Sequence, residues 1–346
     1  MRPVLSPASR RLWRDRTTLQ LGHPSSRAVV LEGFDDQRRL LLPLLDGTRT
    51  RAQVIEEAVL AGCDDAEAVL VVLEHAGLLI DADDLHPREL TRADRDRLAP
   101  DLASLALLRG SKAVQALQAR RSARVVVHGA GRVGAPLAAL LSTAGLGTVE
   151  VIDRQPTRPA DLAVRGLVEQ DLGRLRGDAV SDSLRSLSSV RRPAVVVLTD
   201  EGADDTAQAL LADGMPHLIA RVDEHIGTVG PLVLPGSSAC LHCVDLVRAE
   251  LDPGWPALAA QLDHRGLRAG RSAVACDAVL AMAVAAQAAF QVLALVEGDA
   301  PATIGGSLEL ELPSWRWRRR SWPQHPGCPC AWALQVPQAP PASAAA

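Results

Sequence analysis

Residues 124–141, RVVVHGAGRVGAPLAALL, constrain the fold of this chain more than any other segment. An apolar run predicts a short strand, which leads into Gly129-x-Gly131-x-x-Gly134 and then into an apolar helix. In such a turn the first glycine permits the bend, and the second lets backbone N–H groups approach a phosphate. The third lets the helix pack closely on the strand. The segment therefore predicts a strand–turn–helix unit of the nucleotide-binding kind.

The segments that follow alternate between strands and helices, as a parallel sheet covered by helices requires. Strands are predicted over residues 124–129, 148–153, 193–200 and 216–222. Helices are predicted from the glycine loop to about residue 144, around 167–187 and over 204–214. A further strand with a turn (227–236), a long apolar helix (280–298) and an antiparallel hairpin (306–322) are predicted after them. We therefore expect an α/β fold with a doubly wound, Rossmann-like sheet.

The context of the glycine loop favours a nucleotide site. Asp153 ends the next predicted strand, where a carboxylate accepts hydrogen bonds from ribose hydroxyls. The alternative is a tight turn in a sheet that binds nothing. Arg132, a long cation inside the loop, is the residue that does not fit the usual pattern.

Four cysteines form two close pairs, Cys240-x-x-Cys243 and Cys328-x-Cys330. Two such pairs, brought together by a fold, supply the tetrahedral thiolate set of a structural zinc site with no open position for water. The alternative is four unrelated buried thiols. His242 and His325 lie nearby but are not chosen as ligands, and we expect the remaining cysteines, Cys63 and Cys276, to be small buried side chains.

Residues 17–83 predict a winged-helix module of two strands and three helices. The strands are expected at 17–22 and 27–33, and the helices at 35–47, 50–62 with Thr50 as N-cap and Gly62 as stop, and 64–77. On the third helix we expect Val69, Val72, Leu73 and Ala76 to face the core. The other boundaries are an N-terminal arm (1–16), a helical connector (84–122), the Rossmann-like domain with its zinc site (123–332) and a tail of disordered composition (333–346).

Composition excludes several classes of protein. With 23% charged residues and a net charge of −4, nothing favours nucleic acid or an anionic membrane as a partner. The arginine-rich stretch 314–322 is interpreted as a solvated edge strand. No apolar run of roughly 20 residues and no signal peptide are recognised, so we expect a cytoplasmic protein whose cysteines bind metal rather than form disulfides.

Residues from roughly 112 to 332 resemble the ThiF/MoeB/HesA superfamily, the ubiquitin-activating-type fold. The resemblance rests on the glycine loop, on Asp153, on the LTD that ends at Asp200, and on the GTVGPLVLPG that leads into the first cysteine pair. It implies ATP in the loop, magnesium held at Asp200, a structural zinc clamp, and adenylation of a carboxylate at the terminus of a small protein. A possible homodimer is also expected.

The N-terminal module resembles the PqqD-type peptide-recognition element of ribosomal peptide (RiPP) pathways, through LLDG, VIEEA and VLEHAGLLID. Joined to a ThiF-like domain, it has the architecture of the leader-peptide-binding partners of YcaO cyclodehydratases in bacteriocin biosynthesis. The resemblance implies that a precursor leader peptide adds to strand 27–33 beside the third helix. The residues expected at that peptide site are Val29, Val30, Leu31, Ala68, Val71 and Glu74.

Several positions depart from the adenylating pattern. Arg132 stands where a glycine is usual, the arginine expected after Asp161-Leu162 comes one place late at Arg165, and Arg176 replaces a lysine near the phosphates. We therefore expect a non-catalytic partner of a cyclodehydratase with a degraded adenylation site, and no catalytic residue is assigned. An ATP-dependent adenylyltransferase is the alternative, and a dinucleotide oxidoreductase is a weaker one. The expected nucleotide-site residues are Gly129, Gly131, Gly134, Asp153, Arg165, Arg176 and Asp200.

Overall fold

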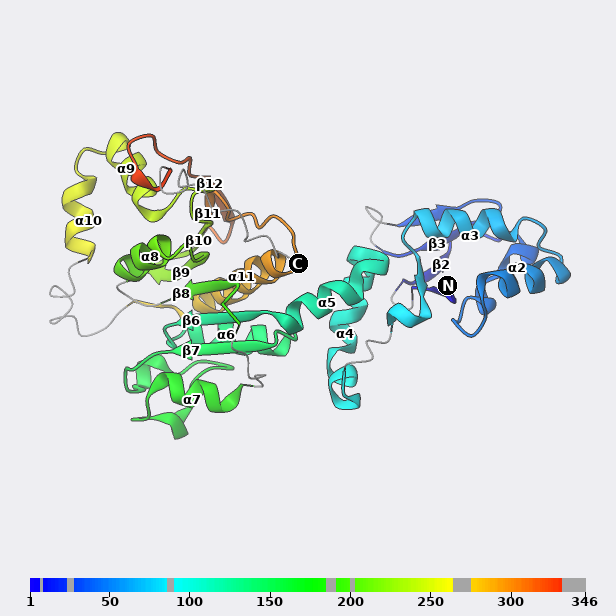
Figure 1. Ribbon diagram of the computed structural model, residues 1–346, viewed down its shortest axis with the longest axis horizontal. Coiled ribbons are helices and arrows are strands. Elements are labelled where there is room, and N and C mark those ends of the chain that lie inside the picture. The colour runs from blue at the N-terminus through cyan, green and yellow to red at the C-terminus, as the bar shows by residue number, and fades with distance from the viewer. Residues whose placement is uncertain are drawn as a thin grey trace, which may run out of the picture. The chain divides into compact units, whose positions relative to one another are not determined.

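The structure is a computed structural model that describes residues 1–6, 9–23, 28–85, 90–184, 191–199, 203–263 and 275–331. The chain divides into two compact units, Met1–Ala119 (unit 1) and Arg120–Ala346 (unit 2), coloured from blue to cyan and from cyan to red in Figure 1. The expected tail, 333–346, lies outside the described residues.

The described strands of unit 1 form two small antiparallel sheets. They are β1 (Pro3–Leu5), β2 (Arg11–Trp13), β3 (Leu19–Leu21), β4 (Val29–Leu31) and β5 (Leu79–Asp81). One sheet has the order β2-β3-β4, and the other pairs β1 with β5. Residues 1–16, expected as a separate arm, thus contribute a strand to each sheet.

Local sequence accounts for the first helices of unit 1, α1 (Asp36–Arg39), α2 (Arg51–Leu60) and α3 (Ala66–His75). Thr50 caps α2 in a capping box with Gln53, and Gly62 follows its end with φ of +102°, as predicted. The single helix predicted over 35–47 is wrong, because the chain instead forms α1 and a 3-10 turn, Leu42–Leu44. Pro43 lacks the N–H that a continuous helix would need there.

The predicted core face of α3 is wrong at two positions. The buried residues are Ala66, Leu70 and Leu73, whereas Val72 is 48% exposed and Ala76 is exposed. Apolar residues surround most of this helix, so more than one face satisfies the helical period.

Two further helices follow, α4 (Arg92–Arg109) and α5 (Ala113–Ser122), with a 3-10 turn, Gly110–Lys112, between them. Most of α5 belongs to unit 1, and its last three residues belong to unit 2. Their apolar residues form one cluster with Ile80 of β5. The segment expected as a connector therefore packs on the β1–β5 sheet.

The described strands of unit 2 form a seven-stranded sheet of order β12-β11-β10-β9-β8-β6-β7 (Figure 1). They are β6 (Arg124–His128), β7 (Thr148–Ile152), β8 (Val195–Leu198), β9 (His217–Asp223), β10 (Ile226–Val233), β11 (Gly306–Glu311) and β12 (Trp317–Ser321). β6 to β9 are parallel, and β10 to β12 add as antiparallel strands. The predicted Rossmann-like α/β fold is confirmed.

Helices cover both faces of this sheet. On one face α6 (Gly134–Thr143), α7 (Arg176–Ser183) and α11 (Ala278–Val296) share the main core. On the other, α8 (Ala203–Ala212) covers Val126, Val196 and Ile219, and α9 (Leu241–Leu251) and α10 (Trp255–Asp263) follow β10. α7 is shorter than the helix predicted over 167–187.

α11 is 19 residues long and apolar enough to cross a membrane by length and composition. The expectation that no run is long enough was therefore wrong. In the structure Leu280, Val284, Ala288 and Val292 of α11 lie in the core against the sheet. α11 is accordingly a core helix of unit 2.

Candidate functional site

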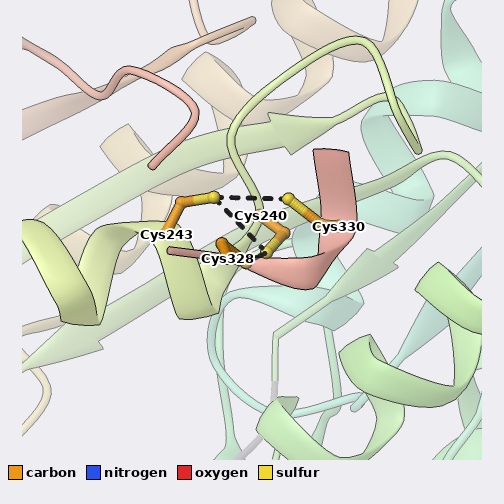
Figure 2. Close-up of side chains that lie close together, drawn as sticks. All are labelled: Cys240, Cys243, Cys328 and Cys330. Atoms are coloured by element: carbon orange, nitrogen blue, oxygen red, sulfur yellow. Dashed lines mark hydrogen bonds between the residues drawn. The ribbon is translucent and has the colours of Figure 1, made fainter. Parts of the chain in front are cut away.

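The four predicted cysteines come together at one point in unit 2 (Figure 2). Cys240 and Cys243 lie at the start of α9, and Cys328 and Cys330 lie in the turn around Pro329–Ala331. The Nε2 amide of Gln324 donates hydrogen bonds to the Gly236 and Ser238 carbonyls (3.3 Å each), which fastens the late segment to the loop before α9. All four sulfurs are buried and lie within 4.8 Å of one another.

The spacing of the sulfurs fits a zinc ion. The Sγ–Sγ distances are 3.8 Å for Cys240–Cys243, 3.6 Å for Cys240–Cys328 and 3.3 Å for Cys243–Cys330. A tetrahedron with Zn–S bonds of about 2.3 Å has edges of about 3.8 Å. Four thiolates at these distances suit a closed, structural site, so these residues fit the metal that the sequence predicts.

The surroundings of the cluster act on its thiols in opposite directions. Burial raises the pKa of Cys240 to about 11 and raises that of Cys330 as well. Burial also acts to raise the pKa of Cys243, but hydrogen bonds from backbone N–H groups and from the Cys330 and Cys328 side chains together outweigh it, and the pKa is lowered. One of these donors is the N–H of His325, 3.4 Å from the Cys243 sulfur. A cation would satisfy the whole set, because a metal binds the deprotonated form.

The glycine loop has the geometry that its sequence predicts. Gly129 has φ of +93°, and its N–H donates to the carbonyl of Ile152 on β7 (3.0 Å). A Cβ on Gly134 would lie 1.9 Å from the carbonyl oxygen of Gly129. The third glycine is therefore required for the close packing of helix on strand.

Asp153, expected to receive a ribose, is already engaged by the protein. Its side chain is 4% exposed, and its Oδ2 accepts from the Ala130 N–H (2.8 Å). The guanidinium of Arg176 lies 3.0 Å from Oδ2 and also donates to Asp161 (3.1 Å). Arg176 thus joins Asp153 and Asp161, and a ribose would have to compete with this ion pair.

Arg132 forms a tether between distant segments. Its Nε donates to the carbonyl of Ala160 (2.7 Å), and its Nη1 donates to the carbonyl of Cys276 (2.8 Å). Cys276, expected to be buried, is only half-buried. The long cation that looked out of place in the loop therefore holds the segments before α7 and α11 together.

The remaining nucleotide-site residues are distributed differently. Arg165 is exposed, with φ of +58°, and Asp200 lies outside the described residues. The sequence did not single out Thr199, whose hydroxyl donates to the carbonyls of His128 (2.9 Å) and Gly129 (3.1 Å). Its place beside Asp200 in LTD was the available signal.

The expected peptide-site residues lie on the surface of unit 1. Val30 of β4 is 37% exposed, Val29 and Leu31 are half-buried, and Ala68, Val71 and Glu74 of α3 are exposed. Glu74 is ion-paired with Arg51 of α2 (2.9 Å). The arrangement leaves the outer edge of β4 without a neighbouring strand within the described part of unit 1.

The sheet is parallel around the glycine loop, is extended by antiparallel strands and carries a four-cysteine cluster. These features define a Rossmann-like α/β domain. The model of the ThiF family matches residues 103–213 of the 346 residues of this chain. The predicted resemblance to the ThiF/MoeB superfamily is confirmed.

Solved structures share this fold over nearly the whole chain. MccB of E. coli with AMPCPP and MccA has a TM-score of 0.73 at 16% identity, covering 96% of this chain and 99% of that one. MccB of E. coli with ATP has a TM-score of 0.71 at 15% identity (95% and 99%), and PaaA has 0.70 at 16% (92% and 99%). At such identities the likeness shows the fold alone. No curated protein matches the sequence.

Proposed function

We propose that this chain is a leader-peptide-binding partner of a YcaO-type cyclodehydratase in the cytosol. Unit 1 binds the leader of a ribosomally made precursor peptide. Unit 2, stabilised by a structural zinc ion, is the scaffold on which the cyclodehydratase docks. The cyclodehydratase then converts Cys, Ser or Thr side chains of the held peptide into azolines.

The open edge of β4 is the observation that carries this proposal. An extended peptide adds to such an edge through backbone hydrogen bonds, while alternate side chains enter neighbouring pockets. Val30 of this edge strand is 37% exposed, so its side chain is available to contact a peptide that adds to β4. Leu31 packs on the core, which keeps the strand in place.

The similar structures support a peptide-related role. The structure of MccB, the Microcin C7 biosynthetic enzyme, was solved in complex with N-formylated MccA. That structure covers 96% of this chain, so the likeness includes unit 1 as well as unit 2. The complex with MccA therefore supports the proposal that this chain also binds a peptide.

An ATP-dependent adenylyltransferase is the second candidate, because MccB was also crystallised with ATP and the glycine loop here is intact in shape. Two contacts, weighed against the demands of catalysis, favour the scaffold over it. Arg132 is tethered to two carbonyls, Arg176 holds Asp153, and a transition state tolerates only small displacements of its donors.

The full-length chain is expected to bind the labelled leader of a precursor encoded beside it with sub- to low-micromolar affinity, about −8 kcal/mol. Val30→Asp and Val71→Asp should each weaken binding at least about tenfold, because a charge would be buried against the guest. Fluorescence anisotropy measures all three proteins. Leu60→Asp, which changes an 81% exposed leucine of α2, is the matched control and should bind normally.

Absence of binding with the correct leader, or an equal loss in Leu60→Asp, contradicts the peptide site. The scaffold role is tested by adding the neighbouring YcaO enzyme and ATP to the precursor. Mass spectrometry should show loss of one water per azoline, and only when the full-length chain is present.

ATP–pyrophosphate exchange is expected to be undetectable when the chain is given any leader or core peptide alone. The reason is that Arg132 and Arg176 are committed to contacts within the protein. Radiolabelled pyrophosphate incorporation is the measurement. Robust exchange that disappears in Asp200→Ala would establish the adenylyltransferase instead.

A further inference from the structure

The antiparallel half of the unit 2 sheet presents a polar face. Thr228 of β10 lies opposite Arg221 of β9 on one side and Glu309 of β11 on the other, and Glu309 lies opposite Arg318 of β12. Residues directly opposite in a sheet share a face. The neighbouring position, Gly227, points the other way and lies against Val284 of α11, so the polar row is on the face away from α11.

Arg248 of α9 is a cation at this polar side of the sheet. It is half-buried, with its guanidinium carbon 4.5 Å from the ring centre of Trp255 and 5.4 Å from that of Trp322. Within the ranges that the structure describes, Arg248 forms no side-chain hydrogen bond or ion pair. Its guanidinium donors therefore point at no protein acceptor.

The charges around Arg248 are already paired with others. Arg221 lies 2.8 Å from Asp223, and Arg320 lies 3.3 Å from Glu309. Asp245, one turn before Arg248, accepts a hydrogen bond from the indole N–H of Trp255 (3.0 Å). These acids are therefore held by other donors, and Arg248 is left as the unpaired member of the group.

The environment of Arg248 is unfavourable for a lone cation. Burial lowers its pKa, and the positive charges of Arg221 and Arg320 lower it further, while Asp245 and Glu309 act against them. An arginine stays protonated under such conditions, because its guanidinium holds its proton very strongly. A half-buried cation without an acceptor costs free energy that a bound anion would recover.

We propose that Arg248, between Trp255 and Trp322, is a binding site for a carboxylate of the peptide that the protein handles. The planar guanidinium fork matches a carboxylate, and stacking on indole faces leaves its donor edges free. Arg320, 5.6 Å from the ring centre of Trp322, supplies a second cation beside the site. The proposal rests on the proposed function for the peptide nature of the ligand and adds where an acidic residue of it docks.

Tryptophan fluorescence reports on the site because two of the six tryptophans, Trp255 and Trp322, flank Arg248. The chain has no tyrosine to contribute to the signal. The full-length protein is titrated with acetyl-Ala-Asp-Ala-amide and with acetyl-Ala-Asn-Ala-amide. The aspartyl probe should give a saturable change and the asparaginyl probe none. Arg248→Gln should bind the aspartyl probe at least about tenfold more weakly, since a charge-assisted hydrogen bond is lost. Arg318→Gln, which removes an exposed cation from the same face, should bind it within about twofold of wild type.

An equal response to both probes, or an unchanged affinity in Arg248→Gln, overturns the proposal. So does saturation by inorganic phosphate without any response to the aspartyl probe, which would make the ligand a phosphate. If Arg248→Gln does not fold, Arg248→Lys replaces it, and equal affinity in that variant overturns the proposal too. The probes carry no leader, so their outcome is independent of whether unit 1 binds one.

Discussion

Replacing Cys328 with serine is expected to strip the metal from unit 2 and to lower its unfolding temperature by about 10 °C or more. The wild-type protein should carry one Zn²⁺ per chain, bound by Cys240, Cys243, Cys328 and Cys330. A structural zinc contributes its binding free energy to folding, of the order of 10 kcal/mol in small zinc domains. Elemental analysis gives the metal content, and a thermal melt followed by circular dichroism gives the stability.

Two controls separate loss of the metal from loss of a thiol. Cys63→Ser alters a cysteine of unit 1 that is 1% exposed and distant in sequence from the cluster, and it should keep the zinc. His242→Ala should keep it as well, because His242 is exposed and is not part of the cluster of ligand atoms. A wild-type protein that contains no zinc and unfolds at the same temperature as Cys328→Ser would refute the site.

The cysteine cluster was predictable because each pair is local in sequence. The spacing of Cys240 and Cys243 places both at the start of α9, and Gly327 and Pro329 permit the turn around Cys328 and Cys330. Meeting of the pairs depends on β10, β11 and β12 lying side by side. The sequence predicted the strand at 227–236 and the hairpin at 306–322, but it did not predict that β10 and β11 would be neighbours.

The contacts of the glycine loop were not predictable in the same way. The loop itself is local, and its strand, turn and helix follow from its residues. The acceptors of Arg132 are 28 and 144 positions away in the chain, at Ala160 and Cys276. No periodicity or spacing relates such segments, so only the packed structure shows that Arg132 is tethered and that Arg176 holds Asp153.

Short elements in unit 1 limited prediction for another reason. β1 and β2 are three residues each, too short for alternation to distinguish a strand from a loop. Their place is set by pairing with β5 and β3, which is a tertiary property. The core face of α3 was misassigned because the valines of this helix lie on several sides, and only contact with neighbouring elements selects among them.

Gly134→Ala is expected to destabilise unit 2 by about 3 kcal/mol or more, which lowers its unfolding temperature by roughly 6–12 °C for a unit of this size. The added Cβ would lie 1.9 Å from the Gly129 carbonyl oxygen and 2.6 Å from Oγ1 of Thr199. The better helix propensity of alanine returns only about 1 kcal/mol. Because the nearest atom is backbone, it cannot move aside, and the clash prevails.

Gly131→Ala is the matched control in the same loop. Its Cβ would meet nothing nearer than Nη1 of Arg176, at 3.6 Å, which is an ordinary contact, so stability should change by less than about 1 kcal/mol. Equal destabilisation by both changes would refute the assignment of Gly134 as the packing glycine. The same two proteins also address the nucleotide, since the second glycine is the one that admits a phosphate. If the loop binds ATP, Gly131→Ala keeps the fold and weakens that binding, whereas a loop that only shapes the fold responds to Gly134→Ala alone.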